Sequence, residues 1–172
     1  MEFYDLITKR CSVRNYDKNR KLDDNTILKI LNASRLAPSA ANKQPWKIIV
    51  ISSPEKLQEI KKCYNKPWFH NAPHVLVVKG KTNEAWQRSY DGYNSIETDL
   101  AILMTYIILA AANEGVGTCW IANFNPEILK EVLHLTKDEK VFGITPLGYP
   151  EQGSIYDENK IRKSIQEIVE FL

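Results

Sequence analysis

The sequence has few of the residues that define disulfide-rich and metal-binding proteins. Its three cysteines, Cys11, Cys63 and Cys119, are odd in number, far apart and without a CxxC pair. This spacing argues against a disulfide framework or a zinc site. The three histidines are isolated and form no HExxH motif, so we predict no metal site. Reduced thiols are typical of the cytosol, and we therefore expect a cytoplasmic protein.

Long hydrophobic runs and an excess of one charge are also missing. The longest apolar stretch, from Leu100 to Ala112, is interrupted by Thr105 and Tyr106. It is shorter than the roughly 18 residues of a membrane-spanning helix. The first residues show no basic segment followed by an apolar one, so we expect no export signal. With a formal net charge of +2 and no basic run, nothing predicts binding to nucleic acid or to a membrane.

Familiar catalytic motifs are absent as well. No serine lies in a GxSxG motif, and no cysteine–histidine couple is visible. Gly115-Val116-Gly117 lacks the third glycine of a dinucleotide-binding fingerprint and precedes an expected strand instead of following one. We expect Gly115 to end a helix and Gly117 to allow close packing. If the protein is an enzyme, a cofactor must carry its chemistry.

The expected elements predict one domain, residues 1–172, of the α+β class. Helices are expected at 3–9, from 23 to 36, from 53 onward, at 95–114 and at 126–133, and strands at 46–51, 74–79, 118–121 and 141–147. Because helices and strands mix without strict alternation, we expect one sheet wrapped by helices. The second helix should bury a face made by Ile27, Ile30, Leu31 and Leu36. The long helix should be buried on nearly all sides, which could place it in the middle of a dimer.

Two other regions are irregular. Residues 80–94 are polar with scattered aromatic residues, and they form a candidate lid. A polar tail from 150 to 162 leads to a final apolar period at Ile165, Ile168, Val169 and Phe171. These apolar residues have nothing local to pack on, so the tail should dock on another surface, such as a second copy of the chain.

Three side chains near the N-terminus have the chemistry to bind a phosphate. Arg10, Ser12 and Arg14 are alternate residues, which point the same way in an extended chain. Two guanidiniums and a hydroxyl could then converge on a dianion. A solvated basic turn is the alternative, because other basic residues lie nearby. Lys160 and Arg162, also two apart, gain interest only if the first cluster holds a phosphate.

The segment 37–46 has the chemistry to bind a planar, hydrogen-bonding ring. The small residues Ser39, Ala40 and Ala41 let the backbone approach a flat ligand closely. Asn42 and Gln44 each offer a donor and an acceptor, as a ring with imide and carbonyl edges requires. The segment could be only a helix-to-strand connection, but its length and two amides favour a site. A phosphate joined to such a ring is a nucleotide or a flavin.

Taken together, these motifs resemble the nitroreductase family of FMN-dependent NAD(P)H oxidoreductases, in particular its short members. The resemblance rests on segments found in the same order along the chain: 10–14, 37–46, 109–121, 147–150 and 160–164. It implies a mostly antiparallel central sheet and a homodimer that exchanges C-terminal arms. Each FMN would lie at the subunit interface, held by both chains.

The resemblance also implies which residues hold the cofactor. Arg10, Ser12, Lys160 and Arg162 would bind the phosphate and ribityl chain. Arg14 would lie near the pyrimidine edge and stabilise the reduced ring. The segment around Ser39 would reach the ring from the second copy, and backbone groups of 121–123 would face its reactive nitrogen. Asn65 is aligned with a ribityl contact. The full predicted set is Arg10, Cys11, Ser12, Arg14, Pro38, Ser39, Ala40, Asn42, Gln44, Asn65, Ile121, Ala122, Asn123, Lys160 and Arg162.

The implied activity is hydride transfer from NADH or NADPH to a small electron-poor acceptor, a nitroaromatic or a quinone, in ping-pong order. No side chain is predicted to be catalytic, because the flavin would carry the chemistry. The alternative is a flavin-binding or flavin-transforming protein that stores, senses or fragments the flavin, or dehalogenates a substrate, without nicotinamide-driven turnover. The short 80–94 segment should leave the channel open, or cap it with Trp86, Tyr90 and Tyr93.

Overall fold

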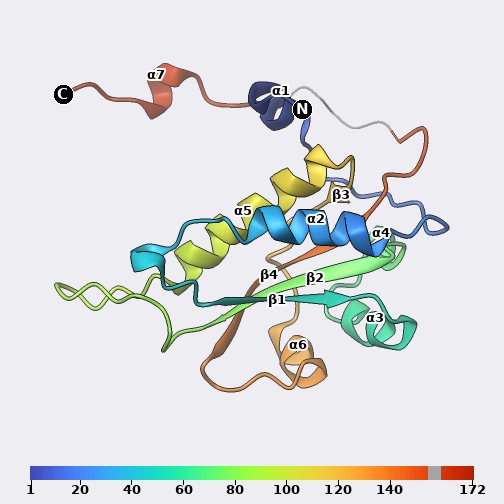
Figure 1. Ribbon diagram of the computed structural model, residues 1–172, viewed down its shortest axis with the longest axis horizontal. Helices are drawn as coiled ribbons and strands as arrows, with labels where there is room; N and C mark the ends of the chain where they lie inside the picture. The colour runs from blue at the N-terminus through green and yellow to red at the C-terminus, as the bar shows by residue number, and fades with distance from the viewer. Residues whose placement is uncertain (155–159) are drawn as a thin grey trace.

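A computed structural model describes residues 1–154 and 160–172 of the chain and shows one antiparallel sheet (Figure 1). The strands are β1 (Trp46–Ile51), β2 (His74–Lys81), β3 (Gly117–Thr118) and β4 (Glu139–Gly148), in the order β1-β2-β4-β3. Every neighbouring pair runs antiparallel. The prediction of an α+β fold with a single, mostly antiparallel sheet is therefore confirmed.

Several of the helices begin at a capping side chain. They are α1 (Phe3–Lys9), α2 (Asp24–Ser34), α3 (Pro54–Lys61), α4 (Pro67–His70), α5 (Ile96–Asn113), α6 (Pro126–Val132) and α7 (Ile165–Ile168), with a 3-10 turn at Ala40–Asn42. Asp23 caps α2 by accepting from the Thr26 N–H, and Ser53 caps α3 by accepting from the Lys56 N–H. Asn125 does the same for α6.

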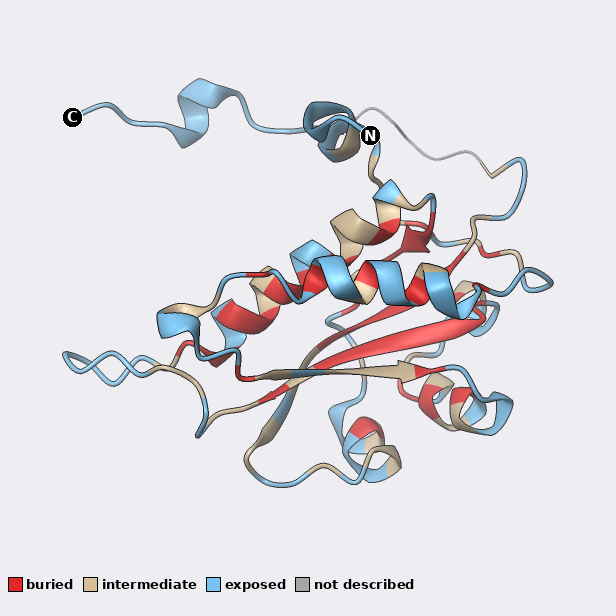
Figure 2. Cartoon of the chain, in the orientation of Figure 1, coloured by how far each residue is buried: buried red, intermediate tan, exposed pale blue. Residues whose placement is uncertain are grey.

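Two hydrophobic cores lie on opposite faces of the sheet, because alternate residues of β2 point to opposite sides. Leu76 and Val78 belong to the core under α2 and α5, and Val75 and Val77 belong to the core over α3 and α6. All four are fully buried, and Figure 2 shows β2 buried along nearly its whole length. The helices thus wrap the sheet from both sides, as expected.

Helix α5 is the central helix of the larger core, but one of its faces is open in the single chain. Leu103, Met104 and Ile107 are fully buried, whereas Ile102 is only half-buried and Tyr106 is 37% exposed. The prediction of burial on nearly all sides is therefore wrong for one chain. The helix is also longer than its unbroken apolar stretch. By length and composition alone it could cross a membrane, but a core helix passes the same test, and α5 is a core helix here.

Glycine ends α5 as predicted. Gly115 has a φ of +70°, and the Val116 N–H turns back to donate to the Ala111 carbonyl. The next element differs from expectation, because the strand predicted at 118–121 is interrupted after Thr118. The Cys119 N–H donates to Thr145 Oγ1 instead of a ladder carbonyl, and pairing resumes only at Ile121.

Helix α2 is shorter than its apolar pattern suggested. It ends at Ser34, whose hydroxyl donates to the Ile30 carbonyl. Leu36 lies beyond the end and is 68% exposed, so its predicted place on the buried face is wrong. Ala37 is the residue that the turn buries at this point. Helix α4 and the 3-10 turn were not predicted at all.

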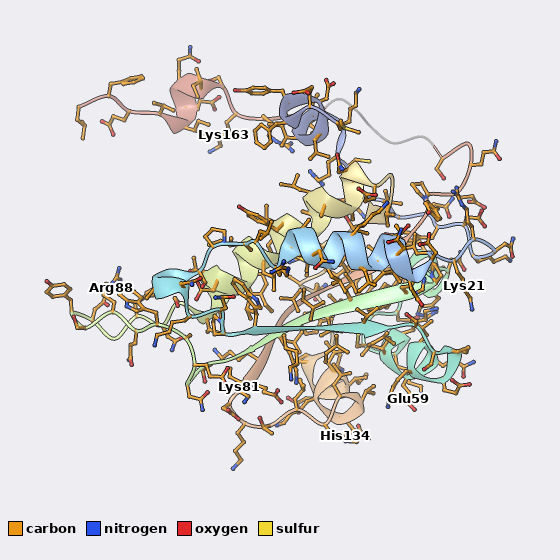
Figure 3. The ribbon with its side chains drawn as sticks, in the orientation of Figure 1. Lys21, Glu59, Lys81, Arg88, His134 and Lys163 are labelled. Carbon is orange, nitrogen blue, oxygen red and sulfur yellow. The ribbon has the colours of Figure 1, made fainter. Side chains whose placement is uncertain are left out.

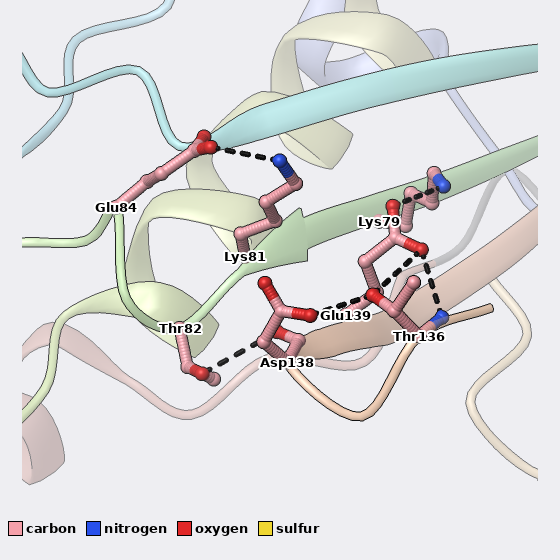
Figure 4. Close-up of polar contacts among 7 residues, drawn as sticks. All are labelled: Lys79, Lys81, Thr82, Glu84, Thr136, Asp138 and Glu139. Atoms are coloured by element: carbon pink, nitrogen blue, oxygen red, sulfur yellow. Dashed lines mark hydrogen bonds and ion pairs between the residues drawn. The ribbon is translucent and has the colours of Figure 1, made fainter.

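Residues 86–94 form a narrow hairpin that projects from the molecule at the start of α5 (Figure 1). Arg88, labelled in Figure 3, pairs with Asp91 at 2.6 Å and lies over the ring of Tyr93. On the neighbouring strands β2 and β4, Lys79 Nζ lies 2.5 Å from Glu139 Oε1 (Figure 4). The hydrogen bond from Lys79 is the main reason that the pKa of Glu139 falls to about 2.

Candidate functional site

The segment that follows α1 has the alternating pattern that the sequence suggested. Val13 points inward and is 5% exposed, and its N–H donates to the Thr118 carbonyl at 2.8 Å. A Cβ at Gly117 would lie 2.8 Å from the Val13 side chain, so only glycine lets the two segments pack this closely. Arg10 and Ser12 are half-buried and Arg14 is exposed. The three therefore lie on the side away from the core.

The last part of the chain returns to this segment. Lys160 Nζ donates to the Ile7 carbonyl at 2.7 Å, at the end of α1 (Figure 1). Burial, followed by the nearby charges of Arg10 and Arg162, lowers the pKa of Lys160. We call Arg10, Arg14, Lys160 and Arg162 the basic cluster. None of the ion pairs within the described residues involves it, so these cations repel one another unless an anion joins them.

The other polar groups around the basic cluster also suit an anion. Cys119 lies beside Ser12 and Arg14, and burial, which outweighs these neighbours, raises the pKa of its thiol. The site therefore presents a neutral thiol at this point. Cys11 lines a cavity of about 170 Å³ together with Leu6, Arg10 and Val116.

Residues 38–45, which we call the amide loop, have an unusual backbone. Ala41, Asn42 and Gln44 have φ values of +49°, +52° and +48°, in the left-handed region that residues other than glycine rarely adopt. Such a conformation costs on the order of 1–3 kcal/mol per residue and persists only where surrounding contacts impose it. Strain of this kind is concentrated at functional sites.

Hydrogen bonds hold the amide loop in this form. The Gln44 N–H donates to Ser39 Oγ at 2.9 Å, and Gln44 Nε2 donates to Asn42 Oδ1 at 3.0 Å. The Ala40 N–H donates to Asp99 Oδ1 on α5 at 2.8 Å. Asn42 and Gln44 remain exposed, as does Pro38. A ligand can therefore reach the Asn42 and Gln44 side chains from solvent.

Of the predicted backbone donors at 121–123, the structure leaves two available. Ile121 already exchanges both hydrogen bonds with Ile144, at 2.9 and 3.0 Å. Its N–H therefore cannot donate to a ligand. Ala122 and Asn123 are exposed, and their N–H groups have no partner within the described part of the chain. These two groups are the available donors.

The single chain does not bring all the predicted residues together. The amide loop is tied to α5 at Asp99, whereas the hollow beside the basic cluster includes Ala112. At a rise of about 1.5 Å per residue, these two points on the helix are roughly 20 Å apart. Asn65 lines a cavity with Gln58 and His70.

Asp99 was not among the predicted site residues. Its contact with Ala40 spans 59 positions along the chain. An acidic residue near the start of an apolar helix was the signal in the sequence that could have pointed to it. Among the described residues, no group of three or more His, Cys, Asp or Glu side chains could hold a metal ion.

Comparisons with known proteins agree with the fold and the motifs. The family model described as "Nitroreductase family" matches residues 7–63 and 58–149. A protein of Archaeoglobus fulgidus with a provisional NADH dehydrogenase/NAD(P)H nitroreductase name is 33% identical over 84% of this chain and 83% of its own.

Solved structures give the same result. A nitroreductase family protein of Clostridium difficile superposes with a TM-score of 0.91 at 30% identity, covering 99% of this chain and 98% of that one. An FMN-dependent nitroreductase from the same species has a TM-score of 0.79 at 25% identity and covers 98% of both chains. With this fold, these motifs and this family match, the chain belongs to the nitroreductase family of oxidoreductases.

Proposed function

We propose that this protein binds FMN and transfers electrons from NADH or NADPH to a small electron-poor acceptor, such as a nitroaromatic or a quinone. The observation that carries the proposal is the basic cluster, in which cations from both ends of one chain meet without a carboxylate partner among the described residues. A phosphate dianion would remove their mutual repulsion and accept their hydrogen bonds.

The residues present fit FMN in their chemistry. Arg10, Lys160 and Arg162, with the Ser12 hydroxyl, would hold the phosphate and the start of the ribityl chain. The buried Cys119 lies beside Arg14, and a few residues after Cys119 come the free N–H groups of Ala122 and Asn123. This line of donors would suit the length of the attached ring.

The position of the amide loop supports a homodimer. The roughly 20 Å along α5 between the loop and the basic cluster exceeds the distance from the phosphorus to the ring edge of FMN. The loop of one chain would therefore meet a flavin whose phosphate is held by the other. The site is incomplete without the second copy.

The apolar surface of the single chain also supports a dimer. The arm that contains α7 extends away from the body, to the left of α1 in Figure 2. Ile161 and Phe171 are 95% and 94% exposed, and Tyr4 on α1 is 79% exposed. Together with the open face of α5, these residues form more exposed apolar surface than a monomer usually carries. An exchange of C-terminal arms would cover it.

The flavin would supply the hydride and electron transfer itself, and the chain's own residues would tune and orient it. The Arg14 guanidinium would stabilise negative charge at the pyrimidine edge, and the N–H of Ala122 or Asn123 would donate to the reactive nitrogen. Because donor and acceptor would use the same open face in turn, nicotinamide would leave before the acceptor binds.

Anaerobic stopped-flow absorbance tests the function. Mixing the purified yellow protein with NADH or NADPH should bleach the flavin bands, and adding a quinone or nitroaromatic should restore them. A flavoprotein that stays yellow with both nicotinamides would contradict the reductase proposal and favour flavin storage, sensing or transformation. Colourless protein that takes up no FMN would contradict flavin binding altogether.

A further inference from the structure

We infer that Asp99 is a positioning residue for the flavin: its buried carboxylate holds the amide loop in the left-handed form that presents the loop to the ring. This inference rests on the proposed function, because it assigns the loop to the ring side of an FMN site. Asp99 would not touch the flavin itself. It acts through the Ala40 N–H.

One carboxylate oxygen of Asp99 contacts the amide loop, and the other contacts the N-cap of its own helix. Asp99 is 1% exposed, and its Oδ1 accepts from the Ala40 N–H at 2.8 Å. Its Oδ2 accepts from Ser95 Oγ at 2.7 Å. Both carboxylate oxygens are therefore engaged, and the Ser95 hydroxyl fixes the direction in which Oδ1 points.

An ordinary role as a helix cap does not account for this arrangement. Ser95 is the N-cap of α5, and its side chain makes no capping hydrogen bond. Its hydroxyl instead donates to the Asp99 carboxylate. Asp99 lies in the first turn of α5, but its carboxylate oxygens accept from the Ala40 N–H and the Ser95 hydroxyl and not from the free N–H groups of the helix. The Ser95 hydroxyl therefore orients the Asp99 carboxylate toward the loop and does not cap the helix.

The hydrogen bond to Asp99 ties one end of the amide loop to α5, and β2 holds the other end. The Pro45 carbonyl accepts from the Lys81 N–H at 3.1 Å, and a Cβ at Gly80 would lie 2.4 Å from that carbonyl oxygen. Three residues between Ala40 and Pro45 are in the left-handed region. Without the hydrogen bond to Asp99, the part of the loop around Ala40 could relax to an ordinary backbone conformation and move Asn42 away from the ring.

Burial makes this bond strong. A carboxylate shielded from water loses its solvation unless hydrogen bonds replace it, so a donor that moves away leaves a costly charge. The Ala40 N–H and the Asp99 carboxylate therefore hold each other in place. An exposed acid on the same helix would give no such constraint.

The test compares variants of Asp99 using FMN and riboflavin as probes. Asp99→Leu removes both acceptors, whereas Asp99→Asn keeps an oxygen for the Ala40 N–H and can hydrogen-bond with Ser95. Glu97→Gln is the matched control, because Glu97 lies on the same turn and is 70% exposed at the side chain. Dissociation constants come from quenching of flavin fluorescence, and amide exchange at Ala40 reports the loop without any ligand.

We expect Asp99→Leu to weaken FMN and riboflavin by the same factor, about tenfold or more, since the loop faces the ring and not the phosphate. Asp99→Asn should recover most of the affinity, Glu97→Gln should match the wild type, and exchange at Ala40 should accelerate only in the leucine variant. If the leucine variant does not fold, Ser95→Ala should produce a smaller loss of the same kind with both probes.

Three results would overturn the inference. Equal affinities in the wild type and Asp99→Leu would show that the loop needs no anchor. An asparagine variant as weak as the leucine variant would show that charge, not position, matters. A loss confined to FMN would place Asp99 at the phosphate. Each leaves the proposed function standing, whereas a wild type that binds neither flavin would overturn both.

Discussion

Replacing Arg10 by glutamine should separate the binding of the phosphate from the stability of the fold. Arg10 lowers the pKa of Lys160, so the two charges repel each other in the ligand-free protein. Removing one charge should leave the free protein as stable as before or slightly more stable. The bound phosphate, in contrast, would lose one charged donor, which is worth about 1.5–3 kcal/mol. The dissociation constant for FMN should therefore rise by about 10- to 100-fold.

Fluorescence titration at low and high salt measures this effect, with riboflavin as the probe that lacks a phosphate. Lys18→Gln is the control, because it removes the same charge from an exposed residue outside the basic cluster. Arg10→Gln should weaken FMN, leave riboflavin unchanged and reduce the salt dependence of binding, whereas Lys18→Gln should do none of these. Equal FMN affinities in the two variants, or an equal loss of riboflavin affinity in Arg10→Gln, would refute the assignment of the cluster to a phosphate.

Three further predictions concern stability and assembly. His74 Nε2 accepts from the Leu22 N–H, and burial lowers the pKa of His74 from 6.5. Because the unfolded chain binds the proton more readily, the free energy of unfolding should fall as pH drops below about 6.5. In His74→Gln, the denaturant midpoint should depend less on pH. Gly80→Ala should cost about 1–3 kcal/mol in the same unfolding assay, because its Cβ would meet the Pro45 oxygen at 2.4 Å. Deleting residues 163–172 should yield monomers in sedimentation, and an unchanged dimer would exclude exchange of the arms.

Much of the fold could be predicted because local chemistry and tertiary structure agree. A continuous run of apolar, mostly β-branched residues defines β2, and Asp23 and Ser53 cap the helices that they precede. Leu36 shows the limit of periodicity, since a pattern continues past the residue at which the chain turns. The strand predicted at 118–121 failed because the Thr145 hydroxyl takes the N–H that a ladder would use.

The candidate site was predictable in its chemistry but not in its geometry. The cationic and amide side chains could be read from the sequence, and the family resemblance assigned them to one cofactor. The left-handed form of Ala41 could not be foreseen, because alanine favours other conformations and a distant contact with Asp99 helps to impose this one. The free N–H groups at Ala122 and Asn123 likewise depend on how Ile121 pairs with Ile144.

The central claim is that each flavin is held by the basic cluster of one chain and the amide loop of the other. Co-expressing two differently tagged chains, one carrying Arg10→Ala with Arg14→Ala and the other Asn42→Ala with Gln44→Ala, tests it directly. In a mixed dimer one site would combine both defects and the other would be intact. Mixed dimers purified through both tags should therefore bind one FMN with wild-type affinity, although neither parent does. Mixed dimers with no tight site would show that a single chain supplies both parts and would contradict the account.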